Sequence, residues 1–167
     1  VDLGYATLTN VASLWNEASG DGGGIWVSSG TLVATNVTQG GDSADTGGGI
    51  YIDSGTATVM NSIVTLSGSG SGISGTSATF SGTYNNVYDN TSSDYSGVTD
   101  PTGSNGNISA DPDFTSWSDD GDYGNDDMTL GSSSNSTDAG NPSSSYNDTD
   151  GSTNDQGAWG GVGGDWE

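Results

Sequence analysis

Ala6-Thr-Leu-Thr-Asn10, Leu32-Val-Ala-Thr-Asn36, Ala57-Thr-Val-Met-Asn61 and Gly82-Thr-Tyr-Asn-Asn86 are the stretches that decide the fold. Each stretch closes on an asparagine, the four asparagines are almost evenly spaced, and apolar and polar residues alternate in most of the stretches. Such alternation is typical of a strand with one buried face. A strand that recurs about every 25 residues predicts a chain wound into stacked coils.

A second repeat has the same period. The sequence Gly-Gly-Gly-Ile occurs at residues 22–25 and again at residues 47–50, and a short alternating strand follows each copy. Each coil is therefore expected to hold two or three short strands joined by turns of Gly, Ser, Asp and Asn. The residues predicted to point inward from these later strands are Ile25, Val27, Ile50, Ile52 and Ile73, with Trp26, Tyr51 and Ser74 outward.

The alternation in the first set of strands predicts a second inward group. Its apolar members are Ala6, Leu8, Leu32, Ala34, Ala57, Val59 and Tyr84. The same parity places four asparagines inside, namely Asn10, Asn36, Asn61 and Asn86. A buried amide is costly unless it is hydrogen-bonded, so we expect each amide to bond its neighbour in the next coil, about 4.8 Å away.

The repeats over about residues 4–90 resemble the right-handed parallel β-helix repeats of secreted and outer-surface bacterial or archaeal proteins. Among these are the Gly-Gly-x-Ile repeats of polymorphic surface proteins. The resemblance implies an all-β, right-handed parallel β-helix of about four coils over residues 1–95. It implies no activity, because β-helices host lyases, hydrolases, adhesins and inert spacers.

Residues 96–167 are expected to form an irregular closing segment rich in Asp, Gly, Ser and Asn on the same helix. Four of its motifs resemble the closing segment of many secreted β-helix proteins, which covers the open end of the helix. These motifs are residues 107–114, 128–130, 138–142 and 148–159. The family pattern usually has a basic residue before the aspartate of the last motif, but this chain has Asn154 before Asp155.

The composition excludes several functions. The chain has no Lys, Arg, His or Cys and a formal charge of −22, so it cannot neutralise the phosphates of nucleic acid or an anionic membrane. The same absences exclude catalytic triads, zinc sites and disulfides. No apolar run is long enough to cross a membrane. We expect a secreted, processed chain that is extracellular or on the cell surface.

Aspartate accounts for all but two of the 22 acidic residues. This bias predicts either calcium binding or adaptation to high salt. Oxygen-bearing side chains alternate around Gly151, which suits Ca²⁺, although the bidentate Glu of a complete calcium loop is missing. The alternatives are an Asx-turn network in this loop and a solvated acidic surface in a second one. The candidate ligands are Asp148, Asp150, Ser152, Asn154 and Asp155, and in the second loop Asp119, Asp120, Asp122 and Asp126.

The leading interpretation is a non-catalytic extracellular structural protein that self-associates by coil stacking into a filament, surface or matrix assembly. An adhesin or glycan-binding stalk with aromatic contacts from Trp15, Trp26 and Tyr51 is the alternative. Lesser alternatives are an ice-binding threonine face, which includes Thr9, Thr35 and Thr83, and an Asp-based glycoside hydrolase that would draw on Asp42, Asp45, Asp53 or Asp89. The predicted assembly surface comprises Val1, Leu3, Tyr5, Thr7, Thr31, Thr56, Thr58, Trp159 and Trp166.

Overall fold

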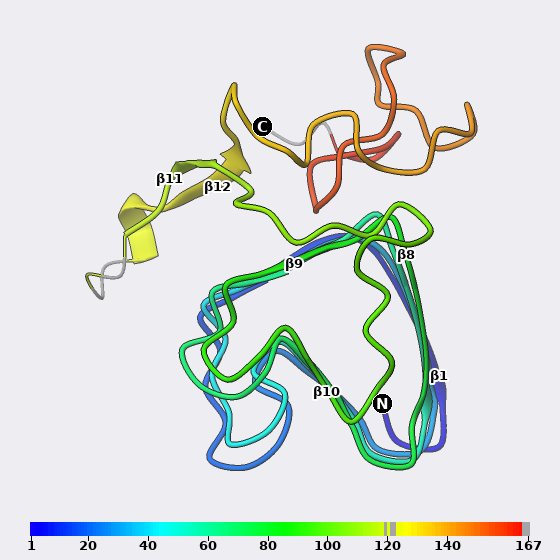
Figure 1. The fold of residues 1–167 in the computed structure, drawn as a ribbon, viewed down its shortest axis with the longest axis vertical. Coiled ribbons are helices and arrows are strands. Elements are labelled where there is room, and N and C mark those ends of the chain that lie inside the picture. Colours follow the sequence, from blue (N-terminus) through cyan, green and yellow to red (C-terminus); the bar gives the residue numbers. More distant parts are fainter. Residues whose placement is uncertain (119, 121–122, 165–167) are drawn as a thin grey trace.

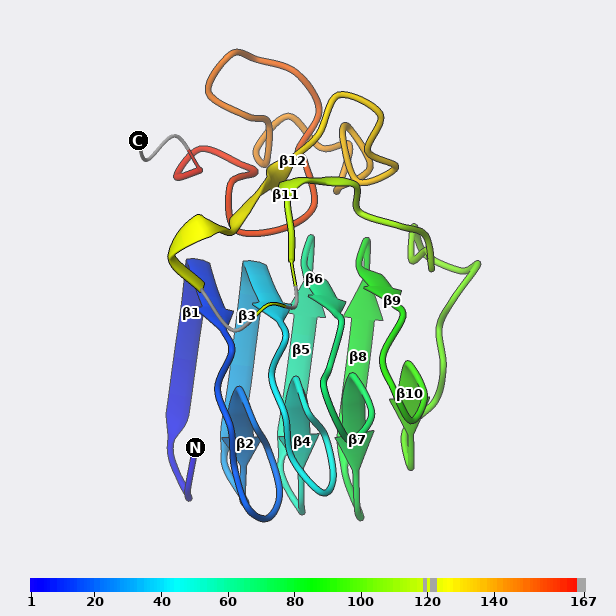
Figure 2. The ribbon, with the colours of Figure 1, turned by 90° about the vertical axis from the view of Figure 1, so that its left-hand side faces the viewer.

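The computed structural model describes residues 1–118, 120 and 123–164. The chain is all-β and forms a parallel β-solenoid of about four turns, as predicted. In Figure 1 the coils lie one behind another, and Figure 2 shows their strands side by side. The strands of coils one and two are β1 (Tyr5–Leu14), β2 (Ile25–Val27), β3 (Thr31–Gly40) and β4 (Ile50–Ile52). Those of coils three and four are β5 (Thr56–Met60), β6 (Ile63–Thr65), β7 (Ile73–Gly75), β8 (Thr79–Thr83), β9 (Asn86–Tyr88) and β10 (Tyr95–Ser96).

Two parallel sheets run along the stack. The larger one has the order β8-β5-β3-β6-β9, with β1 also paired to β3, and the smaller one has the order β10-β7-β4-β2. β1 and β3 are long because each passes around a corner, at Asn10 and at Asn36. Coils three and four use two separate strands on either side of the same corner.

The core is a narrow column of aliphatic side chains between the two sheets. The predicted inward positions are largely confirmed, because alternate residues of β3 and β5 are buried and face alternate residues of β4 and β7. The fully or almost fully buried members of this column are Val27, Leu32, Ala34, Ile50, Ile52, Ala57, Val59 and Ile73.

The repeated glycine turn owes its composition to close packing between coils. Gly22 and Gly47 adopt positive φ angles of 69° and 64°, which an L side chain rarely adopts. A Cβ atom on Gly23 would lie 2.5 Å from the carbonyl oxygen of Gly48 in the next coil. The turn therefore accepts no side chain at Gly22 and Gly47, where φ is positive, or at Gly23, where the next coil is too close.

The coil length changes along the stack, which the sequence pattern did not reveal. Thr31 pairs with Thr56, and Thr56 pairs with Thr79, so the second of these coils is shorter than the first by two residues. The predicted alignment of coil four was therefore wrong by the same amount. Asn86 pairs with Ile63 instead of stacking on Asn61.

Tyr84 occupies the corner position at which the earlier coils have asparagine. Its φ angle is 55°, beside 51°, 53° and 53° for Asn10, Asn36 and Asn61. The prediction that Tyr84 fills the core is therefore wrong. Phe80 stands opposite Ala57 in its place and packs against Tyr95, with ring centroids 6.0 Å apart.

The closing segment has two parts with different positions. After β10 the chain crosses the outline of the coils in Figure 1, and Val98 packs there against the core of the last coil. The following residues lie along the side of the stack, above the corner of every coil in Figure 2. This part contains an antiparallel pair, β11 (Phe114–Ser116) with β12 (Asp127–Leu130), and the 3-10 helix η1 (Tyr123–Asn125).

The expectation that the closing segment covers the open end of the helix is therefore wrong for most of its residues, which lie along the side of the stack (Figure 2). None of the helices in the described ranges is long and apolar enough to cross a membrane.

Candidate functional site

The corner asparagines anchor the closing segment to the coils. The side-chain amide of Asn36 donates hydrogen bonds to Asn154 Oδ1 at 3.0 Å, to the Asp155 carbonyl at 3.0 Å and to the Gly157 carbonyl at 3.1 Å. Asn10 donates to the carbonyls of Ala158 and Gly160, at 2.9 and 2.6 Å. Further along the stack, Asn61 Oδ1 accepts from the backbone amide of Asn141 at 2.9 Å. Three coils are thus tied to one irregular segment.

These contacts correct the predicted interior ladder. Asparagine is tolerated in the left-handed region, and one residue there reverses the parity of the alternation on either side. Asn10, Asn36 and Asn61 consequently point out of the coil toward the closing segment, which buries Asn36 and Asn61 and leaves Asn10 half-buried. Asn86 also points outward, since its amide donates to the Ala110 carbonyl at 2.8 Å.

A polar ladder does exist inside the helix, one residue past the corner. The backbone amide of Val37 donates to Ser62 Oγ, that of Ser62 donates to Asn85 Oδ1, and that of Asn85 donates to Asn107 Oδ1, all at 3.0–3.1 Å. Asn85 and Asn107 are almost fully buried, and their amides donate to the carbonyls of Val59 and Gly82. The sequence signal for Asn85 was the doubled Asn85-Asn86.

The first predicted calcium loop is folded largely around its own backbone. Asp150 Oδ1 accepts from the amide and the hydroxyl of Ser152, and Asp148 accepts from the amides of Asp155 and Gly161. Asn154 is completely buried and bonds Asn36 and the Tyr146 carbonyl, so it faces away from the loop's carboxylates. This is the geometry of the Asx-turn alternative.

The carboxylates of Asp148, Asp150 and Asp155 in this loop and of Asp138 before it nevertheless line one cavity of about 520 Å³, together with Trp159. Burial raises the pKa of Asp155 to about 6, a hydrogen bond from the Asp138 amide opposes the rise, and the charges of Asp148, Asp138 and Asp150 add to it. Burial also raises the pKa of Asp148. No group of three or more acidic side chains among the described residues is close enough to share a metal ion.

The second predicted loop falls partly outside the described residues, namely at Asp119 and Asp122. Asp120 Oδ2 accepts from the side-chain amide of Asn125 at 3.1 Å, and Asp126 Oδ1 accepts from the Ser118 amide at 2.8 Å. These two aspartates therefore hold the loop before β12 in place.

The predicted assembly residues divide into three groups. Leu3 and Tyr5, beside Val1 at the first coil, are 84% and 69% exposed. Trp159 is half-buried in the closing segment, and Trp166 lies outside the described residues. The threonines form outward columns on the face made by β1, β3, β5 and β8. The columns pair Thr31 with Thr56, Thr7 with Val33 and Thr58, and Thr9 with Thr35, and Thr83 pairs with Met60.

The aromatic residues expected for glycan contact do not form one surface. Trp26 is half-exposed on β2, whereas Tyr51 is buried, and its hydroxyl donates to Thr76 Oγ1 at 3.2 Å. Trp15 lies at a different corner, where its ring stacks on Trp117 with centroids 4.3 Å apart and planes 6° from parallel.

Asp42 lies in the loop between β3 and β4, as expected, but it is almost fully buried there. Its Oδ1 accepts from the backbone and side-chain amides of Asn16, at 2.7 and 2.9 Å. Its Oδ2 and the amide of Gln39 have no hydrogen-bond partner among the described residues, although both are almost fully buried. Burial raises the pKa of Asp42 to about 7 despite the hydrogen bonds from Asn16.

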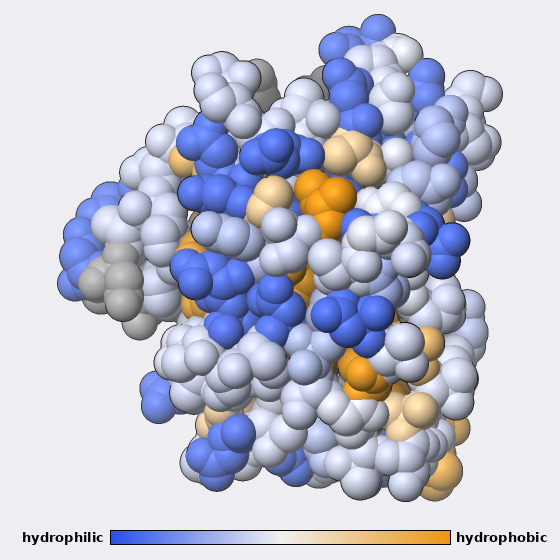
Figure 3. Space-filling model, in the orientation of Figure 1, coloured by the Kyte–Doolittle hydropathy of each residue, from blue (hydrophilic) through white to orange (hydrophobic). Residues whose placement is uncertain are grey.

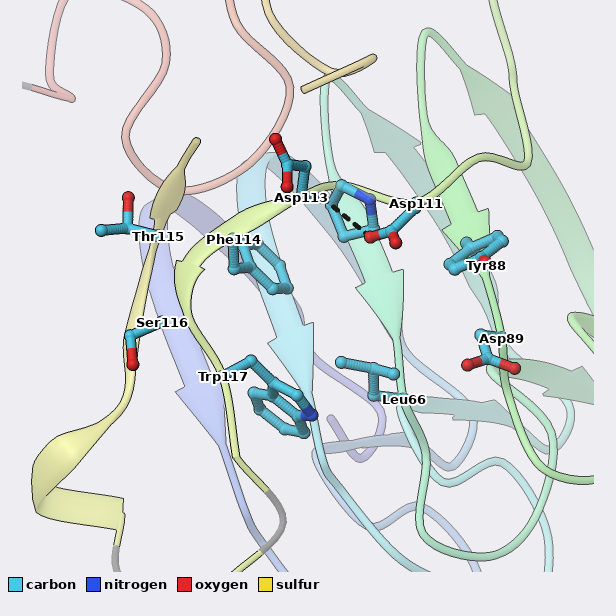
Figure 4. Close-up of a pocket in the computed structure, with 10 residues that line it drawn as sticks. Leu66, Tyr88, Asp89, Asp111, Asp113, Phe114, Thr115, Ser116 and Trp117 are labelled. Atoms are coloured by element: carbon cyan, nitrogen blue, oxygen red, sulfur yellow. Dashed lines mark hydrogen bonds between the residues drawn. The ribbon is translucent and has the colours of Figure 1, made fainter. Parts of the chain in front are cut away.

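A groove that the sequence did not predict runs along the corner at which Trp15 stacks on Trp117 (Figure 4). We call it the lateral groove. It consists of two adjoining cavities of about 470 and 270 Å³, both lined by Leu66, Asp89 and Trp117. Tyr88, Asp111, Asp113 and Phe114 line the larger cavity. Sequence analysis does not reveal the groove because its two walls come from segments distant in the chain.

Figure 3 shows hydrophilic residues spread over most of the face in view, with only small apolar patches between them.

Comparison of the chain with the models of known protein families, with curated proteins and with solved structures finds no significant match.

Proposed function

We propose that this protein is a non-catalytic, extracellular structural subunit that assembles through its first coil. The observation that carries the proposal is the open strand edge there. Among the described residues, β1 pairs only with β3, and β2 pairs only with β4. Figure 2 shows β1 at one side of the stack, with no strand beyond it.

The side chains at this edge favour an apolar partner. Ala6, Leu8 and Val11 of β1 are only partly buried, whereas their counterparts in β3 are at most 1% exposed. An open edge with exposed apolar side chains pairs readily with another strand. The partner that we propose is a second copy of this chain, because its first coil presents the same complementary edge.

Calcium has a specific role in this proposal. Each subunit carries a formal charge of −22 and no basic side chain, so two copies repel each other until cations screen or bind the carboxylates. We propose that calcium acts as a hydrated counterion in the cavity lined by Asp138, Asp148, Asp150 and Asp155, because these side chains are not close enough together to share one ion directly. Burial is the main cause of the raised pKa of Asp148 and Asp155, and the charges of neighbouring aspartates add to it, so a cation in this cavity would offset that repulsion.

The flat face of threonines and Val33 supports lateral packing between subunits. We propose that it adds side-by-side contacts to the stacking at the first coil. Pairing of the strand edges of the first coils would then join subunits end to end, and packing of the threonine faces would join them side by side.

The edge is tested by sedimentation velocity in calcium over a range of protein concentrations. We expect the unmodified chain to self-associate and Leu8→Lys to stay monomeric, because the substitution places a charge in the edge that pairs. Ser144→Lys adds the same charge on an exposed loop of the closing segment and should still associate. Equal association of Leu8→Lys and Ser144→Lys, with unchanged circular dichroism, contradicts the edge as the contact.

A further inference from the structure

We infer that the lateral groove is a binding site for a protonated amine, carried either on an aminosugar or on an aliphatic polyamine. This inference is independent of the proposed assembly, because the larger cavity of the groove is lined by residues of coils three and four and of the closing segment, and by none of the first coil.

The floor of the groove is built by a second column of left-handed residues. Trp15, Gly41, Leu66 and Asp89 have φ angles of 58°, 67°, 57° and 52°, one in each coil. As at the asparagine corner, this conformation turns the side chains outward. A Cβ atom on Gly41 would lie 2.5 Å from the Trp15 ring, so the missing side chain lets this ring lie flat along the stack.

The walls supply aromatic faces on both sides. Phe114 and Trp117, at and just after β11, stand opposite Tyr88 in Figure 4, with Leu66 between Trp117 and Asp89. The stacking of Trp117 on Trp15 holds one wall in place before any ligand arrives. Preorganised aromatic walls lower the entropy lost on binding.

The charge of the groove selects the ligand. Asp89, Asp111 and Asp113 line it, and the chain has no basic residue to neutralise them. No described residue donates a hydrogen bond to the Asp89 side chain, and the Asp111 side chain accepts only from the Asp113 amide. These carboxylates keep acceptor capacity that points toward a donor from outside the chain.

An ammonium group fits this combination better than a neutral hydroxyl group. It has three N–H donors for carboxylate oxygens, and its charge is attracted to the faces of Trp and Tyr rings. The field of the whole chain, with a formal charge of −22, also concentrates cations at its surface. A neutral sugar would gain from the aromatic faces but not from the field.

The experiment is calorimetric titration at physiological ionic strength in chelator, with the mass of the chain checked by sedimentation. The probes are a glucosamine tetramer, spermidine and the neutral N-acetylglucosamine tetramer. Asp89→Asn is the central variant, because asparagine tolerates the left-handed φ of Asp89 while removing its charge. Trp117→Ala tests the aromatic wall, and Asp53→Asn, in the turn after β4, is the matched charge control.

We expect at least one of the two amines to bind, with its affinity reduced at least tenfold in Asp89→Asn and in Trp117→Ala and unchanged in Asp53→Asn. Binding of both amines identifies the ammonium group alone as the ligand, and binding of one identifies the carrier as well. The inference is overturned if the neutral tetramer binds as tightly as the amines, if Asp53→Asn weakens binding as much as Asp89→Asn, or if no probe binds. Because the titration uses the chain in chelator, its failure leaves the assembly proposal standing, and the reverse also holds.

Discussion

Asn107 Oδ1 accepts hydrogen bonds from both the backbone amide and the side-chain amide of Asn85, each at 3.1 Å. Asn85 is the acceptor for the preceding coil in the same way, because the backbone amide of Ser62 donates to Asn85 Oδ1 at 3.0 Å. The backbone amides that face the inside of this corner therefore find acceptors without water. This polar column replaces aliphatic packing where the chain turns.

Replacing Asn85 by Ala should strongly destabilise the fold. The variant leaves the buried amide of Ser62 without its acceptor and removes the hydrogen bond that the Asn85 side chain donates to the Val59 carbonyl. Such losses cost about 1–3 kcal/mol each. Chemical denaturation should show a lower midpoint with an unchanged slope, and Asn135→Ala, on an exposed loop, should leave the midpoint within error. Similar midpoints for the two variants would mean that the interior ladder contributes little.

Two substitutions at Asn36 separate its backbone role from its side-chain role. Asn36→Gly keeps access to the φ of 53° but removes three hydrogen bonds to the closing segment, and Asn36→Ala also adds about 1–2 kcal/mol of backbone strain. We expect the order of stability to be wild type, then Gly, then Ala.

Limited proteolysis with an enzyme that cleaves after aromatic residues should show Tyr146 exposed earlier in both variants. Asn105→Gly, at an exposed residue with a φ of 51°, is the control and should have almost no effect. Equal protection of the closing segment in all three chains would contradict its anchoring by Asn36.

Asp42 should make the fold less stable as the pH rises. Its folded-state pKa, about 7, lies above the value of 3.8 expected for an unfolded chain, so the folded state binds the proton more tightly. The cost of ionisation begins above about pH 4 and grows until the pH is well above about 7. Asp155, with a pKa raised to about 6, acts in the same direction.

Asp42→Asn should remove the larger part of this dependence, because its side-chain oxygen can still accept from Asn16. We expect it to raise the unfolding free energy at pH 8 by a few kcal/mol and to change it little at pH 4.5. Thermal melts of both chains between pH 4.5 and 8 measure the effect. A variant that is less stable than the wild type at pH 8 would show that the carboxylate is needed in its charged form.

Gly41→Ala should separate the two stacked tryptophans. The new methyl group would meet the Trp15 ring at 2.5 Å, in addition to the strain of a φ of 67°. Gly103→Ala is the matched control, because Gly103 has a φ of 79° and a Cβ atom there would have no heavy atom within 4 Å. We expect red-shifted tryptophan emission only in Gly41→Ala. The same spectrum from both variants would exclude the packing of Trp15 over Gly41.

The sequence predicted the coils well where their length was almost constant. Asn10, Asn36 and Asn61 do mark one corner of three successive coils, and the alternation before each of them gives the correct inward residues. The prediction failed where the coil shortens, between Thr56 and Thr79. The doubled Asn85-Asn86 allowed a third step of unchanged length, which put Asn86 in the place of Tyr84.

The direction of the asparagine side chains could not be read from alternation. Parity counting assumes continuous extended backbone, and a left-handed residue interrupts it at each corner. The lateral groove was also beyond sequence reasoning, because its wall from residues 111–117 meets Leu66 and Asp89 only after the closing segment folds back along the coils. Nothing local in either segment indicates the other.

The most direct test of the assembly proposal is negative-stain microscopy of the same protein preparation in calcium and in chelator. The open edge of the first coil and the charge of −22 predict pairs of subunits joined at their first coils in calcium and single particles in chelator. Single particles in both conditions, at concentrations where sedimentation also shows only the monomer, would contradict the proposal that this protein is an assembling structural subunit.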